Sequence, residues 1–557
     1  MDEFSVLIGG KAGFGIDKSS LIIASIFNRL GYRLYIYRDY PSLIRGGHTF
    51  SIIRSSKQKI ASHTNKIDFL LALTQDTVDL HRDKLKDNAI LIYDSDSIKQ
   101  DTLPESGQAI GLALSKIIKE ENAPEIMRNV CVIGALCKAA GIAWSNLEVV
   151  FKKNFPKIGD INLKVARRGY DGVKELLNIE SLNQKKLPLF TGNEATALGL
   201  IKGGLKAYIA YPMTPSSPIL HTMANLAENF SLKVIHPENE IAVMLMALGF
   251  SYCGQKVAVG TSGGGFCLMT EGLSFSAMAE LPVVAIVGQR PGPSTGLPTY
   301  SSQTEMHFAL NAGHGEFTRF VVAPGDAEEA YYWSQVALNI SWKYQIPSII
   351  LSDKTLGEGT YSFDESLIRE IKEEAPLMWD GKGIYKRYMD TDTGVSPLAF
   401  VPNKDAIIKV NSYEHDELGI TTEDPGQTQR MQDKRLRKEK RLAEELASYE
   451  AVKVYTNDRS SVGMLCWGSN KGVCVELGKE LHLKVIQPVV LSPFPIKQLT
   501  DALQSVKLLV VVESNATGQL VRLISRYGIR VQKKILKYDG RPFSLDELEE
   551  KLKEFVG

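Results

Sequence analysis

The sequence has almost no excess of charge of either sign and no long hydrophobic run. Its 557 residues include 65 Lys and Arg against 64 Asp and Glu, so the net charge is +1. A balance this even gives no general attraction to nucleic acid or to an anionic membrane. The longest apolar runs, such as 281–288 and 508–512, are far shorter than the ~20 residues that cross a bilayer. Residues 1–4 also lack the basic start of a secretion signal, so we expect a cytoplasmic protein with neither nucleic-acid nor membrane partners.

Cysteine is scarce, and its spacing excludes two kinds of site. There are six cysteines, and the closest two, Cys131 and Cys137, are separated by five residues. Without a C-x-x-C pair, neither a structural zinc site nor a ferredoxin-type iron–sulfur run is expected within this chain. In a reducing cytosol most of these side chains are expected to be small buried hydrophobes. If the function involves electron transfer, the iron–sulfur cluster must lie in another chain.

Several motifs that hold phosphates or perform catalysis are missing as well. No Gly-Lys-Ser/Thr follows the glycine-rich turn at 9–15, and the spacing of that turn does not match G-x-G-x-x-G. No Ser–His–Asp set, H-E-x-x-H or aspartate pair with metal spacing stands out. The chain also lacks a Gly-Asp-Gly followed by a suitably spaced Asn, the pattern with which thiamine enzymes hold a diphosphate through a divalent ion.

The pattern of apolar and polar residues divides the sequence into four segments. A length of 557 residues suggests about three or four domains. In three segments, strand-like apolar runs alternate with helical patterns, which predicts α/β domains. The remaining segment is polar and shows no clean period apart from one charged helix. The predicted segments are 1–185, 186–360, an extended linker at 361–455, and 456–557.

The predicted strands are short and mostly apolar, as expected for sheets that are covered on both faces. In the first segment they alternate with helices, which is the pattern of a parallel sheet with crossovers. The clearest helices are predicted at 17–30 and 240–252. Strands are predicted at 4–8, 32–37, 69–73 and 89–93, then at 207–210, 233–236, 256–260, 283–288 and 348–351, and finally at 462–467, 484–490, 506–513 and near 528–533.

The charged helix contains a strongly basic run at 434–441. A run of this kind is usually a solvated helix face. The alternative is contact with an acidic partner or with a ligand phosphate. No heptad repeat supports a coiled coil.

Two glycine clusters in the first segment mark a candidate anion site. The turn at 9–15, which includes Gly13, joins a strand to a helix, and backbone N–H groups at such a junction favour a phosphate. The second cluster, at 45–48, places Arg45 beside Gly46. Together the two clusters could hold a phosphorylated ligand such as a nucleotide-bearing thiol carrier. The alternative is a glycine turn that serves only helix–sheet packing.

The most specific local motif is Tyr-Pro-Met-Thr-Pro-Ser-Ser-Pro at 211–218. It follows a predicted strand, at the carboxyl end where ligands bind in open α/β sheets. Three prolines in eight residues stiffen the backbone. Thr214, Ser216 and Ser217 therefore offer hydroxyl groups on a rigid frame, which suits a small carboxylate ligand. The alternative is a rigid turn with capping hydroxyls.

Glu240 opens a helix that is otherwise almost wholly apolar. Capping is the simplest interpretation, because the helix dipole favours a negative charge at this end. A helix that is apolar on nearly every face is expected to be buried, however. A carboxylate at the mouth of a buried helix can share a proton with the nitrogen of a heterocycle.

Two further strand ends complete the candidate site. Thr-Ser-Gly-Gly-Gly at 261–265, with Ser262 and Gly263 at its centre, permits close approach of the backbone to a flat ligand. Arg290 follows the next predicted strand and is expected to project from the same sheet edge as Thr214. A guanidinium there could clamp a carboxylate through two hydrogen bonds.

These residues resemble those of the 2-oxoacid:ferredoxin oxidoreductases. The motif at 211–218 is similar to the substrate loop of that family, and so are Gln-Arg-Pro-Gly-Pro-Ser-Thr-Gly at 289–296 and Gly-His-Gly-Glu at 313–316. The resemblance spans nearly the whole chain and implies an alpha subunit with a gamma domain fused in front of it. The implied fold is α/β with three domains: a gamma-type doubly wound domain, a thiamine diphosphate pyrimidine-binding domain at 186–360, and a small transketolase-C-like domain at 456–557.

The resemblance also implies a reaction. It is the coenzyme A-dependent oxidative decarboxylation of a 2-oxoacid to acyl-CoA and CO2, with reduction of ferredoxin, in either direction. A fused gamma–alpha chain is most often associated with 2-oxoglutarate. The alternatives are pyruvate, a branched-chain or an aryl 2-oxoacid, or a catalytically inactive structural subunit. Retention of Glu240, Thr214 and Arg290 together argues against an inactive subunit.

Roles for single residues follow from the same resemblance. Glu240 would hydrogen-bond the aminopyrimidine of thiamine diphosphate as the catalytic residue. The implied substrate-binding residues are Thr214, Ser216 and Arg290, those on the pyrimidine side of the cofactor are Ser262 and Gly263, and those on the coenzyme A side are Gly13, Arg45 and Gly46.

The implied assembly contains more than this chain. Thiamine diphosphate would be shared with a beta subunit, which would bring Mg²⁺ and a [4Fe-4S] cluster, and no metal ligand is predicted here. Ferredoxin and a small 2-oxoacid are the other implied partners. The expected complex is a dimer of alpha–beta heterodimers.

Overall fold

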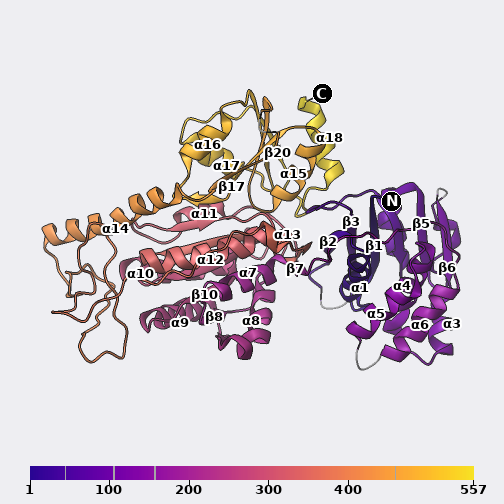
Figure 1. The fold of residues 1–557 in the computed structure, drawn as a ribbon, viewed down its shortest axis with the longest axis horizontal. Helices are drawn as coiled ribbons and strands as arrows, with labels where there is room; N and C mark the ends of the chain where they lie inside the picture. The colour runs from indigo at the N-terminus through magenta and orange to yellow at the C-terminus, as the bar shows by residue number, and fades with distance from the viewer. Residues whose placement is uncertain (44–45, 105–106, 156–158, 458, 557) are drawn as a thin grey trace. The chain divides into compact units, whose positions relative to one another are not determined.

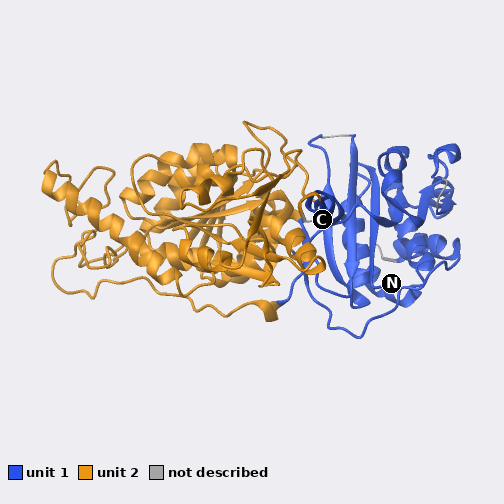
Figure 2. Cartoon of the chain, turned by 90° about the horizontal axis from the view of Figure 1, so that it is seen from above, with its two compact units in different colours: residues 1–190, 359–364, 544–553 blue, residues 191–358, 365–543, 554–557 orange. Residues whose placement is uncertain are grey.

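The computed structural model describes residues 1–557 except 44–45, 105–106, 156–158, 458 and 557. Its strands form sheets of eight, seven and five strands (Figure 1). The chain divides into two compact units, which Figure 2 shows in different colours. Unit 1 comprises residues 1–190, 359–364 and 544–553, and unit 2 comprises residues 191–358, 365–543 and 554–557.

Unit 1 is built on the eight-stranded sheet, in the order β6-β5-β4-β1-β3-β2-β14-β7. Its strands are β1 (Glu3–Lys11), β2 (Arg33–Asp39), β3 (His48–Ser56), β4 (Ile67–Ala72), β5 (Leu85–Asp94), β6 (Gln108–Leu112), β7 (Leu189–Thr191) and β14 (Thr360–Ser362). The helices of this part of the chain are α1 (Ile16–Arg29), α2 (Gln75–His81), α3 (Leu114–Glu120), α4 (Arg128–Ala139), α5 (Trp144–Asn154), α6 (Gly159–Asp171) and α18 (Leu545–Val556).

The prediction of a parallel sheet for the first segment is wrong in part. The strands β1, β4, β5 and β6 are parallel, with helical crossovers. However, β3 runs antiparallel to both of its neighbours, β1 and β2. The described residues of the link from β2 to β3, 40–43 and 46–47, form no helix, and β3 returns directly beside the strand that the chain has just left. The apolar runs alone do not reveal this reversal, because strands buried on both faces look alike in either direction.

Unit 2 contains the seven-stranded sheet, in the order β18-β12-β13-β11-β10-β8-β9. Apart from the β12–β18 pair, neighbouring strands are parallel. The strands are β8 (Ala207–Ala210), β9 (Lys233–Ile235), β10 (Val257–Ser262), β11 (Val283–Gln289), β12 (Phe320–Val322), β13 (Pro347–Asp353) and β18 (Val490–Ser492). The helices are α7 (Gly192–Lys202), α8 (Ser217–Phe230), α9 (Glu240–Tyr252), α10 (Gly263–Met278), α11 (Met306–Asn311), α12 (Ala327–Tyr344) and α13 (Lys354–Glu358).

The third sheet, in the order β15-β17-β16-β19-β20, also belongs to unit 2. Only β15 is antiparallel in it. The alternation of strands and helices confirms the predicted α/β class for this part of the chain. Its elements are β15 (Val452–Thr456), β16 (Val462–Cys466), β17 (Lys484–Pro488), β19 (Leu508–Glu513), β20 (Lys533–Leu536), α15 (Lys471–Glu480), α16 (Ile496–Leu503) and α17 (Gln519–Ser525).

The basic run lies on α14 (Pro425–Leu446), and the prediction of a solvated face is wrong for part of it. Lys434 and Lys438 are buried. Both ammonium groups pair with the buried carboxylate of Glu280, and Lys434 Nζ lies 2.7 Å from Glu280 Oε1. These cations hold the pKa of Glu280 well below its usual range against the effect of burial, whereas burial lowers the pKa of Lys438 to about 7. The acidic partner of the run is therefore within this chain.

Replacing Glu280 by Gln is expected to destabilise the chain by about 3–5 kcal/mol, because two buried ammonium groups lose their counter-charge. Urea unfolding of the purified protein measures the effect. Glu444→Gln is the matched control. Glu444 pairs with Arg441 on an exposed part of α14, the helix that carries Lys434 and Lys438, and its replacement should change stability by at most ~0.5 kcal/mol. Equal effects of the two substitutions would contradict a structural role for the Glu280 cluster.

Cys131, Cys137, Cys466 and Cys474 are buried, whereas Cys253 and Cys267 are exposed. This agrees with the expectation that most of the cysteines are buried hydrophobes. Among the described residues, none of the helices combines the length and the apolar character needed to cross a membrane.

Candidate functional site

The candidate residues of unit 2 gather at one edge of the seven-stranded sheet. In the parallel pairs, Ala210 lies opposite Gly260, and Ser262 lies opposite Gly288. The strands β8, β10 and β11 therefore end side by side, and the loops that follow them leave from the same carboxyl edge. Helix α9 begins after β9 at that edge as well. The structure thus confirms the shared sheet edge that the sequence predicts.

The loop at 211–218 packs against the end of β11. A Cβ placed on Gly288 would lie only 3.0 Å from Pro215 Cγ. The close packing of the loop on β11 therefore favours glycine at position 288. Ser216 Oγ donates a hydrogen bond to the Met213 carbonyl at 2.9 Å and thereby stabilises the turn. In contrast, no hydrogen bond of Thr214 Oγ1 is found among the described residues. The Thr214 hydroxyl therefore remains available to a ligand.

Arg290 connects the end of β11 to that loop. Its Nη1 donates to the Thr214 carbonyl at 3.0 Å, and the residue is only 9% exposed. Burial lowers the pKa of the Arg290 guanidinium, while the nearby Glu305 carboxylate acts in the opposite direction. A guanidinium held here keeps donors free for a carboxylate ligand beside Thr214.

Glu240 is buried at the start of α9, and it is not the cap of that helix. The cap is Asn239, whose Oδ1 accepts a hydrogen bond from Ala242 N at 3.0 Å. The Glu240 carboxyl points instead toward the first turn of α10: a Cβ on Gly265 would collide with Glu240 Oε1 and with Thr261 Oγ1. This contact argues against the capping interpretation and explains why a glycine stands at position 265.

Replacing Gly265 by Ala is expected to lower kcat by about 10²-fold or more, because the added methyl group displaces the carboxyl of Glu240. The neighbouring change Gly264→Ala is a matched control, since its Cβ would meet only Ser294 O, at 3.9 Å. Steady-state kinetics of the two variants, each assembled with the beta subunit that the sequence resemblance implies, provide the measurement. If Gly264→Ala were as damaging as Gly265→Ala, helix distortion rather than displacement of Glu240 would be the cause.

The end of β10, just before helix α10, carries two unsatisfied polar groups. The buried hydroxyls of Thr261 and Ser262 have no hydrogen-bond partner among the described residues. Ser262 occupies the cap position of the helix but makes no side-chain capping bond. Gly263 follows it with no side chain of its own. Buried hydroxyls without partners, beside a glycine run that leaves room for close approach, are groups that a polar ligand would satisfy.

Sequence reasoning missed Glu305, which joins this group of residues. The carboxyl of Glu305 lies against Gly263, where an added Cβ would be 2.7 Å from Glu305 Oε1. Burial raises the pKa of Glu305 to about 7. Its position just before a short helix, in a polar stretch without a motif, gives no sequence signal, and only the fold places it here.

The glycine clusters of unit 1 also come together. Lys11, at the end of β1, lies opposite His48 at the start of β3. Ala12 N donates to the Gly47 carbonyl at 3.3 Å, which joins the two turns directly. Gly13 and Gly46 have positive φ angles of 94° and 79°, and nothing lies within 4 Å of a Cβ placed on either. Arg45 lies outside the described residues.

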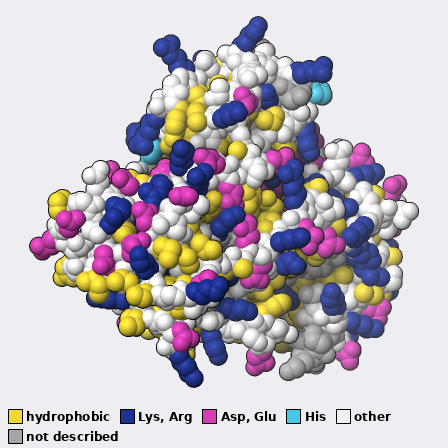
Figure 3. All heavy atoms as spheres, turned by 60° about the vertical axis from the view of Figure 1, so that its left-hand side comes forward, with side chains coloured by type: hydrophobic (Ala, Val, Ile, Leu, Met, Phe, Trp, Pro, Cys, Tyr) yellow, Lys and Arg dark blue, Asp and Glu magenta, His cyan; other side chains and the backbone are white. Residues whose placement is uncertain are grey.

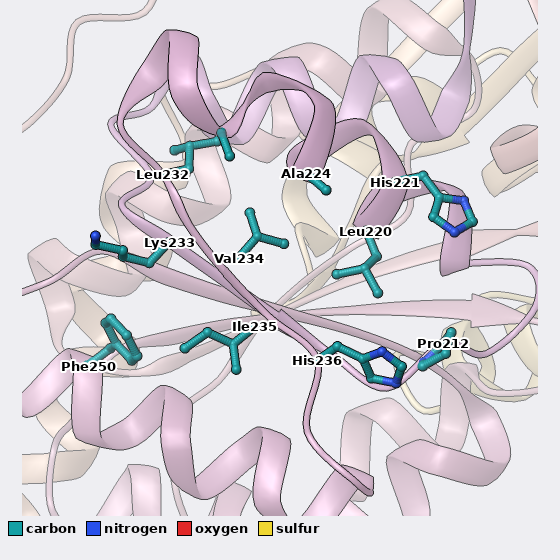
Figure 4. Close-up of a pocket in the computed structure, with 11 residues that line it drawn as sticks. Pro212, Leu220, His221, Ala224, Leu232, Lys233, Val234, Ile235, His236 and Phe250 are labelled. Atoms are coloured by element: carbon teal, nitrogen blue, oxygen red, sulfur yellow. The ribbon is translucent and has the colours of Figure 1, made fainter.

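A separate apolar cavity of about 800 Å³ opens beside the site (Figure 4). Helix α8 and the edge strand β9 supply most of its lining, and Phe250 of α9 contributes as well. Pro212 is the residue of the 211–218 loop that reaches it. Figure 4 shows the His236 and Pro212 side chains next to each other at one end. Thr214, Arg290 and Glu240 do not line this cavity, so it is distinct from their group.

Comparison with known proteins gives matches over nearly the whole chain. A family profile described as pyruvate flavodoxin/ferredoxin oxidoreductase, thiamine diphosphate-binding, matches residues 198–434. A second profile, pyruvate ferredoxin/flavodoxin oxidoreductase, matches residues 5–172. The alpha subunit of a 2-oxoacid:ferredoxin oxidoreductase from Sulfolobus sp. is 31% identical over 99% of this chain and 96% of its own length.

Two other relatives carry a narrower description. A 2-oxoglutarate synthase subunit from Archaeoglobus fulgidus is 30% identical over 61% of this chain and 91% of its own length. A solved 2-oxoglutarate:ferredoxin oxidoreductase from Magnetococcus marinus, with 2-oxoglutarate, coenzyme A and succinyl-CoA bound, matches all of this chain and all of its own with a TM-score of 0.91 at 28% identity. The full-length identity and the two profiles confirm the resemblance found in the sequence: this chain belongs to the thiamine diphosphate-dependent 2-oxoacid:ferredoxin oxidoreductases, as an alpha subunit.

Proposed function

We propose that this subunit acts in the coenzyme A-dependent oxidation of 2-oxoglutarate to succinyl-CoA and CO2, with reduction of ferredoxin, and that the reaction runs in either direction. The observation that carries the proposal is the full-length fold match to an enzyme solved with 2-oxoglutarate, coenzyme A and succinyl-CoA. The relative named as a 2-oxoglutarate synthase subunit supports the same substrate.

The residues at the carboxyl edge fit a thiamine pyrimidine. A buried carboxyl, Glu240, stands beside a glycine turn where a Cβ would fill the space, and two orphaned hydroxyls lie at the end of β10, just before that turn. Glu240 would hold a proton against a pyrimidine nitrogen, and Ser262 and Gly263 would line the ring face. When bound, thiamine diphosphate supplies a carbon nucleophile for the oxo group of the substrate. The part of this chain is to orient the ring and to move that proton.

The substrate carboxylate belongs, in this proposal, between Thr214 and Arg290. The guanidinium is already fixed by the Thr214 carbonyl, so little side-chain freedom is lost when the substrate binds. The Thr214 hydroxyl faces no competing partner among the described residues. Ser216 supports the loop by its bond to Met213 and holds the frame in place.

A beta subunit is the expected partner, and it is expected to bring the metal and iron–sulfur groups. Among the described residues, no group of three or more His, Cys, Asp or Glu side chains is placed to hold a metal ion. Helices α9 and α10 also present an unusual apolar face, with Ile241, Leu245, Met246 and Leu268 between 43% and 51% exposed. Figure 3 brings forward the side of unit 2 that carries these helices and shows hydrophobic side chains gathered in patches between charged ones.

The position of the apolar face of α9 and α10 also supports a beta subunit as the partner. Helix α9 starts at Glu240, and Gly272 of α10 packs against Met244 and lies near Leu245. The exposed side chains of the two helices therefore form one surface that continues from the catalytic carboxyl. Helices that are apolar on nearly every face are normally covered. We assign this surface to the subunit that holds the diphosphate, in a dimer of alpha–beta heterodimers.

Coenzyme A is proposed to approach the joined glycine turns of unit 1. The backbone at Gly13 and Gly46 is open to a ligand, since a methyl group added at either position would meet no other atom within 4 Å. Glycine turns with free backbone N–H groups suit a phosphate. Arg45 is proposed as the cation of this site.

Anaerobic co-purification and a substrate panel test the proposal. The chain is purified with its partners, and coenzyme A-dependent viologen reduction is measured with 2-oxoglutarate, pyruvate, branched-chain and aryl 2-oxoacids. The expected result is a cysteine-bearing partner and the highest kcat/KM with 2-oxoglutarate. A preference for pyruvate or another 2-oxoacid would overturn the substrate assignment. A complex that contains thiamine diphosphate but oxidises none of these acids would overturn the catalytic assignment.

A further inference from the structure

A second carboxyl stands at the start of α10, opposite the side where Glu240 lies. The Glu240 carboxyl lies where a Cβ on Gly265 would be, and the Glu305 carboxyl lies where a Cβ on Gly263 would be. A Cβ on Gly263 would be 2.7 Å from Glu305 Oε1, 2.8 Å from its Cγ and 2.9 Å from its Cδ. The glycine turn is thus flanked by two acidic side chains, and the proposed function uses only one of them.

The Glu305 carboxyl is only half satisfied. Its Oε1 accepts a hydrogen bond from Thr304 Oγ1 at 2.9 Å, and its backbone N donates to Gln289 Oε1 at 3.1 Å. Its Oε2 is buried and has no hydrogen-bond partner among the described residues. A buried carboxyl oxygen without a partner costs free energy unless a ligand or a proton satisfies it.

The charged groups around Glu305 come from two neighbouring strands. Arg290, at the end of β11, attracts the carboxylate and favours its charged form. Asp353, at the end of β13, repels the carboxylate and favours the neutral form. Burial is the largest influence, and it raises the pKa of Glu305 to about 7. This side chain can therefore hold and release a proton near neutral pH, within the electrostatic reach of the guanidinium assigned to the substrate.

We propose that Glu305 is a further catalytic residue of this site, a neutral carboxylic acid whose Oε2–H donates a hydrogen bond to the oxo oxygen of the 2-oxoacid. The inference rests on the proposed function, because the oxo group reaches Glu305 only if Arg290 and Thr214 hold the adjoining carboxylate. When a nucleophile adds to the oxo carbon, a bond forms at carbon and the π electron pair of C=O moves to oxygen. That oxygen takes the Glu305 proton, and Glu305 becomes a carboxylate. The proton returns when C=O re-forms in the acyl product.

The pH dependence of Glu305→Gln tests the proposal in the reconstituted complex. Glutamine keeps the size of the side chain and can donate a hydrogen bond, but it cannot release a proton. In the wild-type complex, kcat/KM for the 2-oxoacid should fall as pH rises through about 7, where Glu305 loses its proton. In Glu305→Gln this dependence should vanish, and kcat should be lower by about 10²-fold or more. Glu228→Gln, at an exposed position of helix α8 outside the motifs of the site, should behave as wild type.

Thermal unfolding gives a readout that does not need activity. A carboxyl whose pKa is raised on folding costs stability above that pKa and costs nothing well below the unfolded pKa. The Tm of Glu305→Gln relative to wild type should therefore be higher at pH 8 than at pH 5. A Tm difference that is the same at both pH values would overturn the proposal, and so would a Glu305→Gln enzyme with the wild-type pH profile.

The wild-type and Glu305→Gln complexes distinguish failure of the proposed function from failure of the role of Glu305. A wild-type complex that oxidises no 2-oxoacid would refute the proposed function itself. A wild-type complex that is active, together with a Glu305→Gln complex of unchanged kcat and pH profile, would refute only the role of Glu305.

Discussion

Glu240→Gln should reduce kcat of the reconstituted enzyme by about 10²–10⁴-fold, the range in which a positioned acid or base contributes to proton transfer. The amide fits the same space against Gly265 and Thr261 but cannot hold a proton against the pyrimidine. The fold should be retained, because Asn239 and not Glu240 caps helix α9. Steady-state kinetics, with the bound thiamine diphosphate quantified in parallel, give the measurement.

Glu238 provides the matched control for this prediction. It is a glutamate two positions earlier, exposed rather than buried. Glu238→Gln makes the same chemical change at a solvent-exposed side chain and should leave kcat within about twofold of wild type. Near-full activity of Glu240→Gln would refute the proposed proton transfer, whereas a loss of bound cofactor at full folding would show that Glu240 acts in binding instead.

Arg290→Ala should raise KM for the 2-oxoacid by about 30- to 1,000-fold. Loss of a charged hydrogen-bonding partner costs about 2–4 kcal/mol, and each 1.4 kcal/mol corresponds to a factor of ten. The loss is expected to appear mainly in KM and kcat/KM for the 2-oxoacid, while KM for coenzyme A should stay the same. Initial rates at varied concentrations of each substrate separate these constants.

Arg441→Ala is the control for Arg290. Arg441 pairs with Glu444 on an exposed part of α14, with the arginine side chain 46% exposed. Its removal should leave both Michaelis constants unchanged. Arg290→Lys should give an intermediate effect, because the charge remains while the paired donors of the guanidinium are lost. An unchanged KM in Arg290→Ala would remove this residue from the substrate site.

Much of the candidate site was predictable because its motifs stand at strand ends. The strand at 207–210 and the helix at 240–252 have the predicted bounds. Once the strands are parallel neighbours, the loops that follow them must share an edge. The placement of Thr214, Glu240 and Arg290 at one edge therefore followed from short apolar runs and their order along the chain.

Other features depended on contacts that the sequence does not show. Glu305 contacts Gly263, although the two residues are 42 positions apart along the chain. No sequence pattern predicts this contact. Lys434 and Lys438 looked like solvent-exposed cations, yet both lie buried against Glu280. A charge run has the same appearance in sequence whether solvent surrounds it or a carboxylate distant along the chain neutralises it.

The order of residues alone was enough to predict the α/β class, the family, and the shared sheet edge of the residues that we propose to bind a 2-oxoacid and a thiamine ring. These depend on local features: apolar runs of strand length, glycine turns, and a proline-stiffened loop. Three features required the folded chain: the reversed strand β3, the contact between the glycine turns through Ala12 and Gly47, and the second carboxyl beside α10. Strand direction, burial of charge and the distance between remote side chains are settled by the packing of the whole chain, whereas strand and turn formation depend largely on near neighbours.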